Sequence, residues 1–308
     1  MKILLFGSNG MLGNYVKSFL SKDYEIIPLT RKDYDLSQLS IVSLTNLLIS
    51  KNLQKDDIVI NCAGVIPQAS KQRGLNTRLY FTINSLFPVV LSQICDKLGA
   101  KMIHVTTDCV FTGKEGKYNE ESIHDEINDY GLSKSLGELC KATIIRTSII
   151  GEEVNNKRSL LEWVKSNSGK EIKGYENHYW NGVTCLQLAK IVKSILDSNS
   201  FWTGVRHIFS PRSVSKFELV SIINNVYDLD IKINKHQTDN QVNKTITSIH
   251  PQIFVIPDLK DQIEELKQYN LPEGDSVEAL AARADIEAKV AAAAAGEVEQ
   301  AQAVAEAI

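Results

Sequence analysis

Lys2-Ile3-Leu4-Leu5-Phe6 runs directly into Gly7-Ser8-Asn9-Gly10-Met11-Leu12-Gly13, at the start of a chain of 308 residues. The apolar stretch has the length of a buried strand, and the pattern from Met11 to Leu20 predicts an amphipathic helix. Gly7 permits a tight turn, Gly10 lets the backbone approach a bound group, and Gly13 allows the helix to pack closely on the strand. A helix N-terminus offers unpaired N–H groups and a positive dipole end, so the loop predicts a pyrophosphate site. The alternative is a glycine turn with no binding role.

Four further apolar stretches of strand length alternate with helical patterns along the chain. Strands are predicted at Tyr24–Pro28, Asp57–Asn61, Lys101–Thr106 and Ala142–Thr147. Helices are predicted at Met11–Leu20, Ile41–Lys51, Arg78–Lys97 and Tyr130–Lys141. Because the strands are continuously apolar, both faces of their sheet should be covered. The alternation predicts an α/β fold with a doubly wound parallel sheet of the Rossmann type.

The domain organisation follows from where this alternation weakens, after Gly151. We expect a dinucleotide-binding domain over residues 1–150, with return segments from 182–210. A smaller C-terminal substrate-binding lobe should span 151–270, next to the carboxyl ends of the strands.

The end of the chain has a different composition. Residues 1–270 contain 5 Ala, whereas 276–308 contain 14 Ala and one Lys. Alanine is the strongest helix former, so residues 271–308 are predicted to be an Ala-rich helical appendage that is not native to the domain. A native oligomerisation helix is the alternative.

Composition and charge exclude several classes of protein. Lys and Arg number 34 against 37 Asp and Glu, which gives a net charge of −3 and no basic footprint for nucleic acid or an anionic membrane surface. No apolar run approaches the ~20 residues that span a bilayer. The 5 cysteines include no Cys-x-x-Cys pair, and the 6 histidines are scattered, so no zinc ribbon, disulfide scaffold or metal site is expected. We expect a cytoplasmic protein, and a homodimer is compatible with the chain.

Three residues predict proton-transfer chemistry. The fourth predicted strand ends in His104-Val105-Thr106-Thr107-Asp108, and Tyr130-Gly131-Leu132-Ser133-Lys134 follows 23 residues after Thr107. Tyr and Lys at positions i and i+4 lie on one face of a helix, where the Lys134 ammonium should lower the pKa of Tyr130. The phenol could then deliver a proton to a carbonyl oxygen held by Thr107 while hydride reaches the carbon. His104 is predicted to be a core histidine with satisfied hydrogen bonds rather than a ligand. Glu120, Glu121, Asp125 and Glu126 are predicted to be a charge run on a solvated loop near the mouth of the active site.

Cofactor choice depends on the end of the second predicted strand. Arg31 and Lys32 stand where an acidic residue would bind the adenosine ribose and repel a 2′-phosphate. Arg31 could pair with that phosphate in bidentate fashion, so NADPH is favoured. NADH use stays open, because Asp35 could engage the ribose hydroxyls, and Arg31 and Lys32 could also be ordinary solvated charges.

Over residues 1–270 the chain resembles the dTDP-4-dehydrorhamnose reductase family, the nucleotide-sugar branch of the extended short-chain dehydrogenases/reductases. The matching segments are Gly7–Gly13, Asp35–Ser37, Asn61–Gly64, Thr106–Gly113, Tyr130–Glu138, Arg146–Ser148 and Trp180–Thr184. The resemblance implies that Thr107 and Asp108 contact the sugar and that Thr107, Tyr130 and Lys134 are catalytic. With Arg31, the candidate cofactor-binding residues are Gly7, Asn9, Gly10, Met11, Leu12, Gly13, Asp35, Leu36, Ala63, Gly64, Val65, Val105, Tyr130 and Lys134.

The resemblance also implies a reaction. It predicts NAD(P)H-dependent reduction of a nucleotide-linked 4-keto-6-deoxyhexose, for the biosynthesis of surface polysaccharide sugars. Cys109 stands where the family usually has Tyr, and Ile149 and Ile150 stand where an aromatic residue commonly lines the sugar pocket, so the identity of the sugar stays open. A 4,6-dehydratase is disfavoured because Cys109 follows Asp108 in place of the required base. A nucleotide-sugar 4-epimerase and a non-catalytic NADP-binding regulatory subunit remain alternatives.

Overall fold

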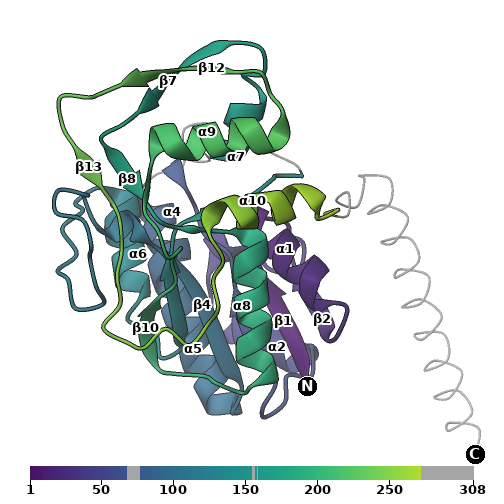
Figure 1. The fold of residues 1–308 in the computed structure, drawn as a ribbon. Helices are drawn as coiled ribbons and strands as arrows, with labels where there is room; N and C mark the ends of the chain where they lie inside the picture. The colour runs from purple at the N-terminus through teal and green to yellow at the C-terminus, as the bar shows by residue number, and fades with distance from the viewer. Residues whose placement is uncertain (68–76, 155–156, 158, 272–308) are drawn as a thin grey trace, which may run out of the picture. The chain divides into compact units, whose positions relative to one another are not determined.

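A parallel sheet of six strands forms the centre of the described chain (Figure 1). The computed structural model describes residues 1–67, 77–154, 157 and 159–271. The strands lie in the order β10-β5-β4-β3-β1-β2, and every neighbouring pair is parallel. Their bounds are β1 Lys2–Phe6, β2 Glu25–Leu29, β3 Ile58–Asn61, β4 Lys101–Thr107, β5 Thr143–Thr147 and β10 Gly204–His207. The chain moves outward from β1 in both directions, so the predicted doubly wound fold class is confirmed.

Helices cover both faces of this sheet, because neighbouring residues of each strand point to opposite sides. Ile3 and Leu5 pack into a core with α1 (Met11–Leu20) and α8 (Cys185–Asp197). Leu4 and Phe6 pack on the other side with α2 (Ile41–Ser50) and α5 (Phe87–Leu98). Burial on both faces explains why the strands are continuously apolar.

The remaining elements lie mostly after β5. They are β6 Ile149–Ile150, α7 Leu160–Lys165, β7 Glu171–Tyr175, β8 His178–Trp180, β9 Val183–Thr184, β11 Val214–Ser215, α9 Lys216–Tyr227, β12 Lys232–His236, β13 Val242–Asn243 and α10 Leu259–Gln268. A three-stranded sheet has the order β11-β8-β13, and β7 pairs with β12. Figure 1 shows β7, β12 and α9 beyond one end of the central sheet. The division into two lobes at residue 150 stays a prediction, since 1–271 form one compact unit.

Three sequence-based element predictions differ from the structure. The predicted helix Arg78–Lys97 is divided into α4 (Thr77–Phe81), a π-helical turn η2 (Thr82–Leu86) and α5. The predicted helix Tyr130–Lys141 is α6, Asp129–Gly137, which ends earlier. Strand β10 was not among the five predicted strands, although it lies within the return segments 182–210. The predicted appendage lies, apart from Leu271, outside the described residues.

In the part of the chain described here, no helix combines the length and the apolar character that crossing a bilayer requires.

Candidate active site

The glycine loop between β1 and α1 has a backbone that only glycine fits at two positions. Gly7 has a φ of +75°, and a Cβ there would lie 2.6 Å from the Ala63 nitrogen. A Cβ on Gly13 would lie 2.0 Å from the Gly7 oxygen. Helix α1 starts at Met11, and the amides of its first turn have no carbonyl partner within the helix. The loop therefore presents free N–H groups at the carboxyl end of β1, as a pyrophosphate requires.

The carboxyl ends of β1, β3 and β4 bring the next group of residues beside this loop. Phe6 pairs with Asn61, and Asn61 pairs with His104. The Asn61 side chain accepts a hydrogen bond from the Ala63 nitrogen at 3.0 Å and its Nδ2 lies 3.1 Å from His104 Nδ1. Burial lowers the pKa of His104 to about 3, so the ring is neutral. Its Nε2 has no partner among the described residues. His104 is thus a core histidine, as predicted, but the prediction that its hydrogen bonds are satisfied is wrong for Nε2.

Helix α6 carries the predicted Tyr–Lys pair. Asn128 caps its N-terminus by accepting a hydrogen bond from the Gly131 nitrogen at 2.8 Å, which fixes where Tyr130 enters the helix. Lys134 is buried, and its Nζ would lie 3.3 Å from a Cβ placed on Gly64. Thr107 ends β4, and its hydroxyl lies near enough to the Tyr130 phenol to lower the phenol pKa, against the larger effect of burial. The three predicted catalytic residues therefore lie together.

Burial decides the protonation of this group. Desolvation raises the pKa of Tyr130, and the Thr107 hydrogen bond only partly opposes this rise. Desolvation lowers the pKa of Lys134, against the attraction of Glu138. The expectation that Lys134 lowers the pKa of Tyr130 is not met, because burial raises this pKa and Lys134 is not among the groups that act on the phenol most strongly. Tyr130 is consequently a protonated phenol at neutral pH.

Asn84 is a site residue that the sequence analysis missed. It lies in η2, and its side chain accepts from the Val65 nitrogen at 2.8 Å and donates to the Val65 oxygen at 3.0 Å and to Ser133 Oγ at 3.1 Å. Asn84 thereby ties the loop that follows β3 to helix α6. The signal was Pro88, which has no N–H for the Asn84 carbonyl four residues earlier and so interrupts a helical pattern.

Asp108 and Cys109 lie on the other side of Thr107, at the start of the 3₁₀ turn η3 (Asp108–Val110). Asp108 is buried, accepts a hydrogen bond from Thr107 Oγ1 at 3.2 Å and has a pKa raised by desolvation. Burial raises the pKa of the Cys109 thiol to about 11. A neutral thiol cannot serve as a base at neutral pH, which agrees with the argument against dehydration.

The remaining predicted cofactor residues are divided between a rim and the core. Arg31 is exposed beyond β2, and Asp35 accepts a hydrogen bond from the Ser37 nitrogen at 2.9 Å as the cap of η1 (Leu36–Gln38). Leu36 and Tyr130 pack against one apolar cluster, which contains Val65. Leu12 and Val105 are buried in the core between the sheet and α1, so their side chains support the site from beneath.

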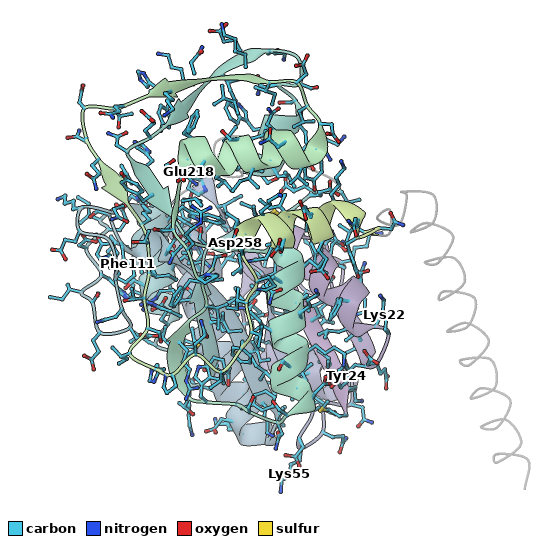
Figure 2. All side chains as sticks on the ribbon, viewed as in Figure 1. Lys22, Tyr24, Lys55, Phe111, Glu218 and Asp258 are labelled. Carbon is cyan, nitrogen blue, oxygen red and sulfur yellow. The ribbon has the colours of Figure 1, made fainter. Side chains whose placement is uncertain are left out.

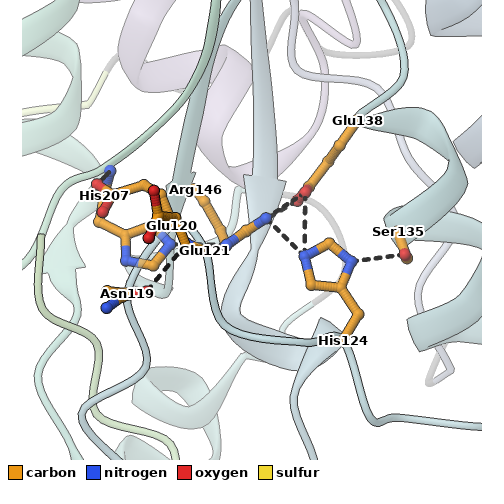
Figure 3. A network of polar contacts seen from close by, with 8 residues as sticks. All are labelled: Asn119, Glu120, Glu121, His124, Ser135, Glu138, Arg146 and His207. Carbon is orange, nitrogen blue, oxygen red and sulfur yellow. Dashed lines mark hydrogen bonds and ion pairs between the residues drawn. The ribbon is translucent and has the colours of Figure 1, made fainter. Parts of the chain in front are cut away.

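A buried polar network lies behind α6 (Figure 3). The Arg146 guanidinium is 1 % exposed and forms an ion pair with Glu138, to which Nε donates at 3.0 Å. Its other nitrogens lie 2.8 Å from His207 Nε2 and 2.7 Å from His124 Nε2. Burial lowers the pKa of His124 and brings that of His207 to about 4, so both rings are neutral and accept from Arg146 through Nε2.

The loop that approaches this network corrects one expectation. Glu120 accepts hydrogen bonds from the His207 nitrogen at 2.8 Å and from Ser248 Oγ at 2.6 Å. Asp125 accepts from the Thr112 nitrogen at 2.7 Å. The prediction of a solvated charge run is therefore wrong for these two carboxylates, because each one anchors loop backbone.

Within the described ranges, no three His, Cys, Asp or Glu side chains gather as a metal ion would require.

Comparisons with known proteins place this site in a family. The model of the RmlD substrate binding domain matches residues 1–252. The spore coat polysaccharide biosynthesis protein SpsK of Bacillus subtilis is 26% identical over 79% of this chain and 86% of its own length. A dTDP-4-dehydrorhamnose reductase of Burkholderia thailandensis is 31% identical over 46% of each chain, so the match spans about half of that relative.

Solved structures show the same fold. A dTDP-4-dehydrorhamnose reductase from Clostridium acetobutylicum superposes with a TM-score of 0.71 at 22% identity, over 87% of this chain and 99% of that chain. The enzyme from Bacillus anthracis, solved in complex with NADP, gives 0.72 at 21% identity, over 87% and 98%. The match to the family model covers most of the described residues and contains the glycine loop, Thr107, Tyr130 and Lys134. The chain therefore belongs to the RmlD family, and the resemblance to dTDP-4-dehydrorhamnose reductases seen in the sequence is confirmed.

Proposed function

We propose that the protein is an NADPH-dependent reductase that converts a nucleotide-linked 4-keto-6-deoxyhexose to its 4-hydroxy form. The observation that carries this proposal is the convergence of Thr107, Tyr130 and Lys134 beside the end of β3. Relatives named as dTDP-4-dehydrorhamnose reductases support the reaction class. A spore coat polysaccharide protein among the relatives supports a role in polysaccharide biosynthesis.

The residues at the glycine loop fit a nicotinamide dinucleotide. Gly7 and Gly13 leave open backbone where side chains would collide, and Lys134 lies beside Gly64, where a ribose could be held. The Bacillus anthracis relative was solved with NADP, which supports NADPH as the cofactor. When bound, NADPH would supply the hydride.

The three catalytic side chains divide the work between them. The Thr107 hydroxyl hydrogen-bonds the substrate carbonyl oxygen and orients it towards Tyr130. Tyr130, protonated because burial raises its pKa, donates its proton to that oxygen. Lys134 holds the ribose and, as a buried cation, stabilises the phenolate that remains. Asn84 positions Lys134 and Gly64 by its hydrogen bonds to Val65 and Ser133.

The alternatives fit the site less well. A non-catalytic NADP-binding subunit has no need for the assembled group of Thr107, Tyr130 and Lys134. A nucleotide-sugar 4-epimerase would use the same residues but would oxidise and then reduce the sugar, with no net consumption of NADPH. Product analysis separates these reactions.

The proton donor is tested by Tyr130→Phe. This change removes one hydroxyl, so kcat should fall by ~10²–10⁴-fold while the Kd for NADPH stays close to that of the wild type. Stopped-flow absorbance and fluorescence titration measure the two quantities. Tyr24→Phe is the control, because Tyr24 lies just before β2, at the opposite edge of the sheet, and hydrogen-bonds Asp197. Full activity in Tyr130→Phe would overturn the assignment.

A further inference from the structure

Two lysines lie on either side of Trp180 in the three-stranded sheet β11-β8-β13. Val214 of β11 pairs with Trp180, and Lys216 follows two residues later. Asn243 of β13 pairs with Tyr179, so Lys244 lies level with Trp180, and its backbone nitrogen donates to the Tyr179 oxygen at 3.1 Å. The sheet therefore brings two cations together from segments far apart in the sequence.

Both lysine side chains lie near the residues that follow β4. The Lys216 ammonium lies 5.3 Å from the centre of the Trp180 ring. The Lys244 stem runs along the loop after η3, because its Cγ would lie 3.0 Å from a Cβ on Gly113. Both ammonium groups oppose the rise in the pKa of Asp108 that desolvation causes, and Lys244 helps to lower the pKa of Lys216.

The positive charges of Lys216 and Lys244 exceed the negative charge of the Asp108 carboxylate beside them. Neither lysine ammonium has an ion-pair or hydrogen-bond partner anywhere in the described ranges, so two cations face one carboxylate that is itself poorly solvated. Desolvation lowers the pKa of Lys216, which indicates that water compensates its charge incompletely. Such an excess of positive charge in a half-buried position attracts an anion.

The position of Lys216 in helix α9 also disfavours its positive charge. It is the first residue of α9, where the positive end of the helix dipole disfavours a cation. Glu218, labelled in Figure 2, does not neutralise it, because its carboxylate accepts from the Ser215 nitrogen at 2.7 Å in a capping box. A residue that breaks a local rule without compensation in the fold is expected at a functional site.

We propose that Lys216 and Lys244 form an anion site that binds the diphosphate of the nucleotide sugar. This inference rests on the proposed function, which assigns Thr107 and Asp108 to the sugar, because the diphosphate is joined directly to that sugar. Lysine ammonium groups bind phosphate oxygens as point charges, and Trp180 supplies an apolar wall beside one of them.

The test measures ligand binding without turnover. Lys216→Gln, Lys244→Gln and the double variant are titrated calorimetrically with dTDP, UDP and GDP, with the nucleoside monophosphates and with glucuronate. Each single change should weaken diphosphate binding by about tenfold to a hundredfold, and should weaken monophosphate binding less. Lys216→Arg, which keeps the charge, should restore most of the affinity. Lys232→Gln is the control, since Lys232 is exposed in the same region and pairs with Glu171.

Three outcomes are decisive. Weaker diphosphate binding with unchanged NADPH affinity supports the site, even if no keto sugar is reduced and the proposed function fails. Unchanged diphosphate binding in a folded double variant overturns the site, and so does a loss confined to glucuronate. Thermal unfolding checks the fold, and Lys216→Gln should not lower Tm, because it removes a cation from the positive end of a helix.

Discussion

The Tyr130 phenol and the Lys134 ammonium lie one helical turn apart, and burial acts on both in the direction of the neutral form. A phenol that keeps its proton at neutral pH suits a donor in a reduction. The group can release this proton when charge develops on the carbonyl oxygen, since Lys134 and Thr107 then stabilise the phenolate. We propose that the pair is arranged for reduction by a protonated phenol, the proton donor that the sequence predicted, although the phenol pKa is raised and not lowered.

At the residue scale, we propose that Arg31 determines the preference for NADPH. Its guanidinium is exposed, and it contributes to lowering the pKa of Asp35, whose main cause is the hydrogen bond from Ser37. Arg31→Ala should lower the ratio of kcat/KM for NADPH to that for NADH by about tenfold, because solvent weakens a phosphate–guanidinium contact. Steady-state kinetics with both cofactors measure the ratio.

The matched control for Arg31 is Lys55→Ala. Lys55 is also an exposed cation, but it precedes β3 and so lies near the amino ends of the strands, at the bottom of the view in Figure 2. An unchanged ratio in Arg31→Ala, or a preference of the wild type for NADH, would show that Arg31 is only a solvated loop residue.

Sequence spacing was sufficient for the residues that belong to one local motif. Gly7, Gly13, Thr107, Tyr130 and Lys134 follow strand ends or occupy one helical face, so their proximity follows from regular geometry. Lys216 and Lys244 could not be found in this way. They follow the short strands β11 and β13, which have no periodic signal, and they meet only through pairing with β8.

At the scale of elements, a buried ion pair connects the C-terminal end of α6 to the central sheet. Glu138 follows the last residue of α6, and its pairing with Arg146 of β5 ties the end of the helix to the sheet. The neutral rings of His124 and His207 accept from Arg146 but do not neutralise it. Arg146 thus depends on one carboxylate for charge compensation.

Glu138→Ala should lower the free energy of unfolding by about 3–5 kcal/mol, because it leaves the Arg146 guanidinium buried without a counter-charge. Urea unfolding followed by circular dichroism measures the change. Asp96→Ala is the control, since Asp96 pairs with Lys141 at the surface, where side-chain exposures are 56% and 67%. A loss in Glu138→Ala no larger than that in the control would contradict the role given to the ion pair.

The bounds of elements were predictable where one local pattern decides them. Strand β1 and helix α1 have the predicted bounds, because burial on both sheet faces and a helical apolar stripe leave little choice. Helix α6 ends at Gly137, before the predicted Lys141, and Gly137 lies against η2. A Cβ on Gly137 would lie 2.1 Å from the Asn84 oxygen, so α6 and η2 approach closely there. That contact depends on the π-helical turn, which periodicity did not indicate.

At the scale of the whole molecule, we propose that residues from both halves of the chain complete the site. The carboxyl ends of β1, β3 and β4 supply the glycine loop, Gly64 and Thr107, and the β11-β8-β13 sheet supplies Lys216 and Lys244. The cofactor residues come from the first half of the chain, and the proposed diphosphate contacts come from the second. This division agrees with the predicted dinucleotide-binding and substrate-binding parts, which remain a proposal about domains.

The most direct test of the account is the stoichiometry of NADPH consumption with dTDP-linked 4-keto-6-deoxyhexoses. We predict that the full chain oxidises one NADPH for each 4-hydroxy sugar formed, followed by absorbance and by product chromatography. A 4-epimerase would form a new sugar without net oxidation of NADPH, and a binding subunit would form no product. Either of these results, across dTDP-, UDP- and GDP-linked keto sugars, would contradict the assignment as a reductase.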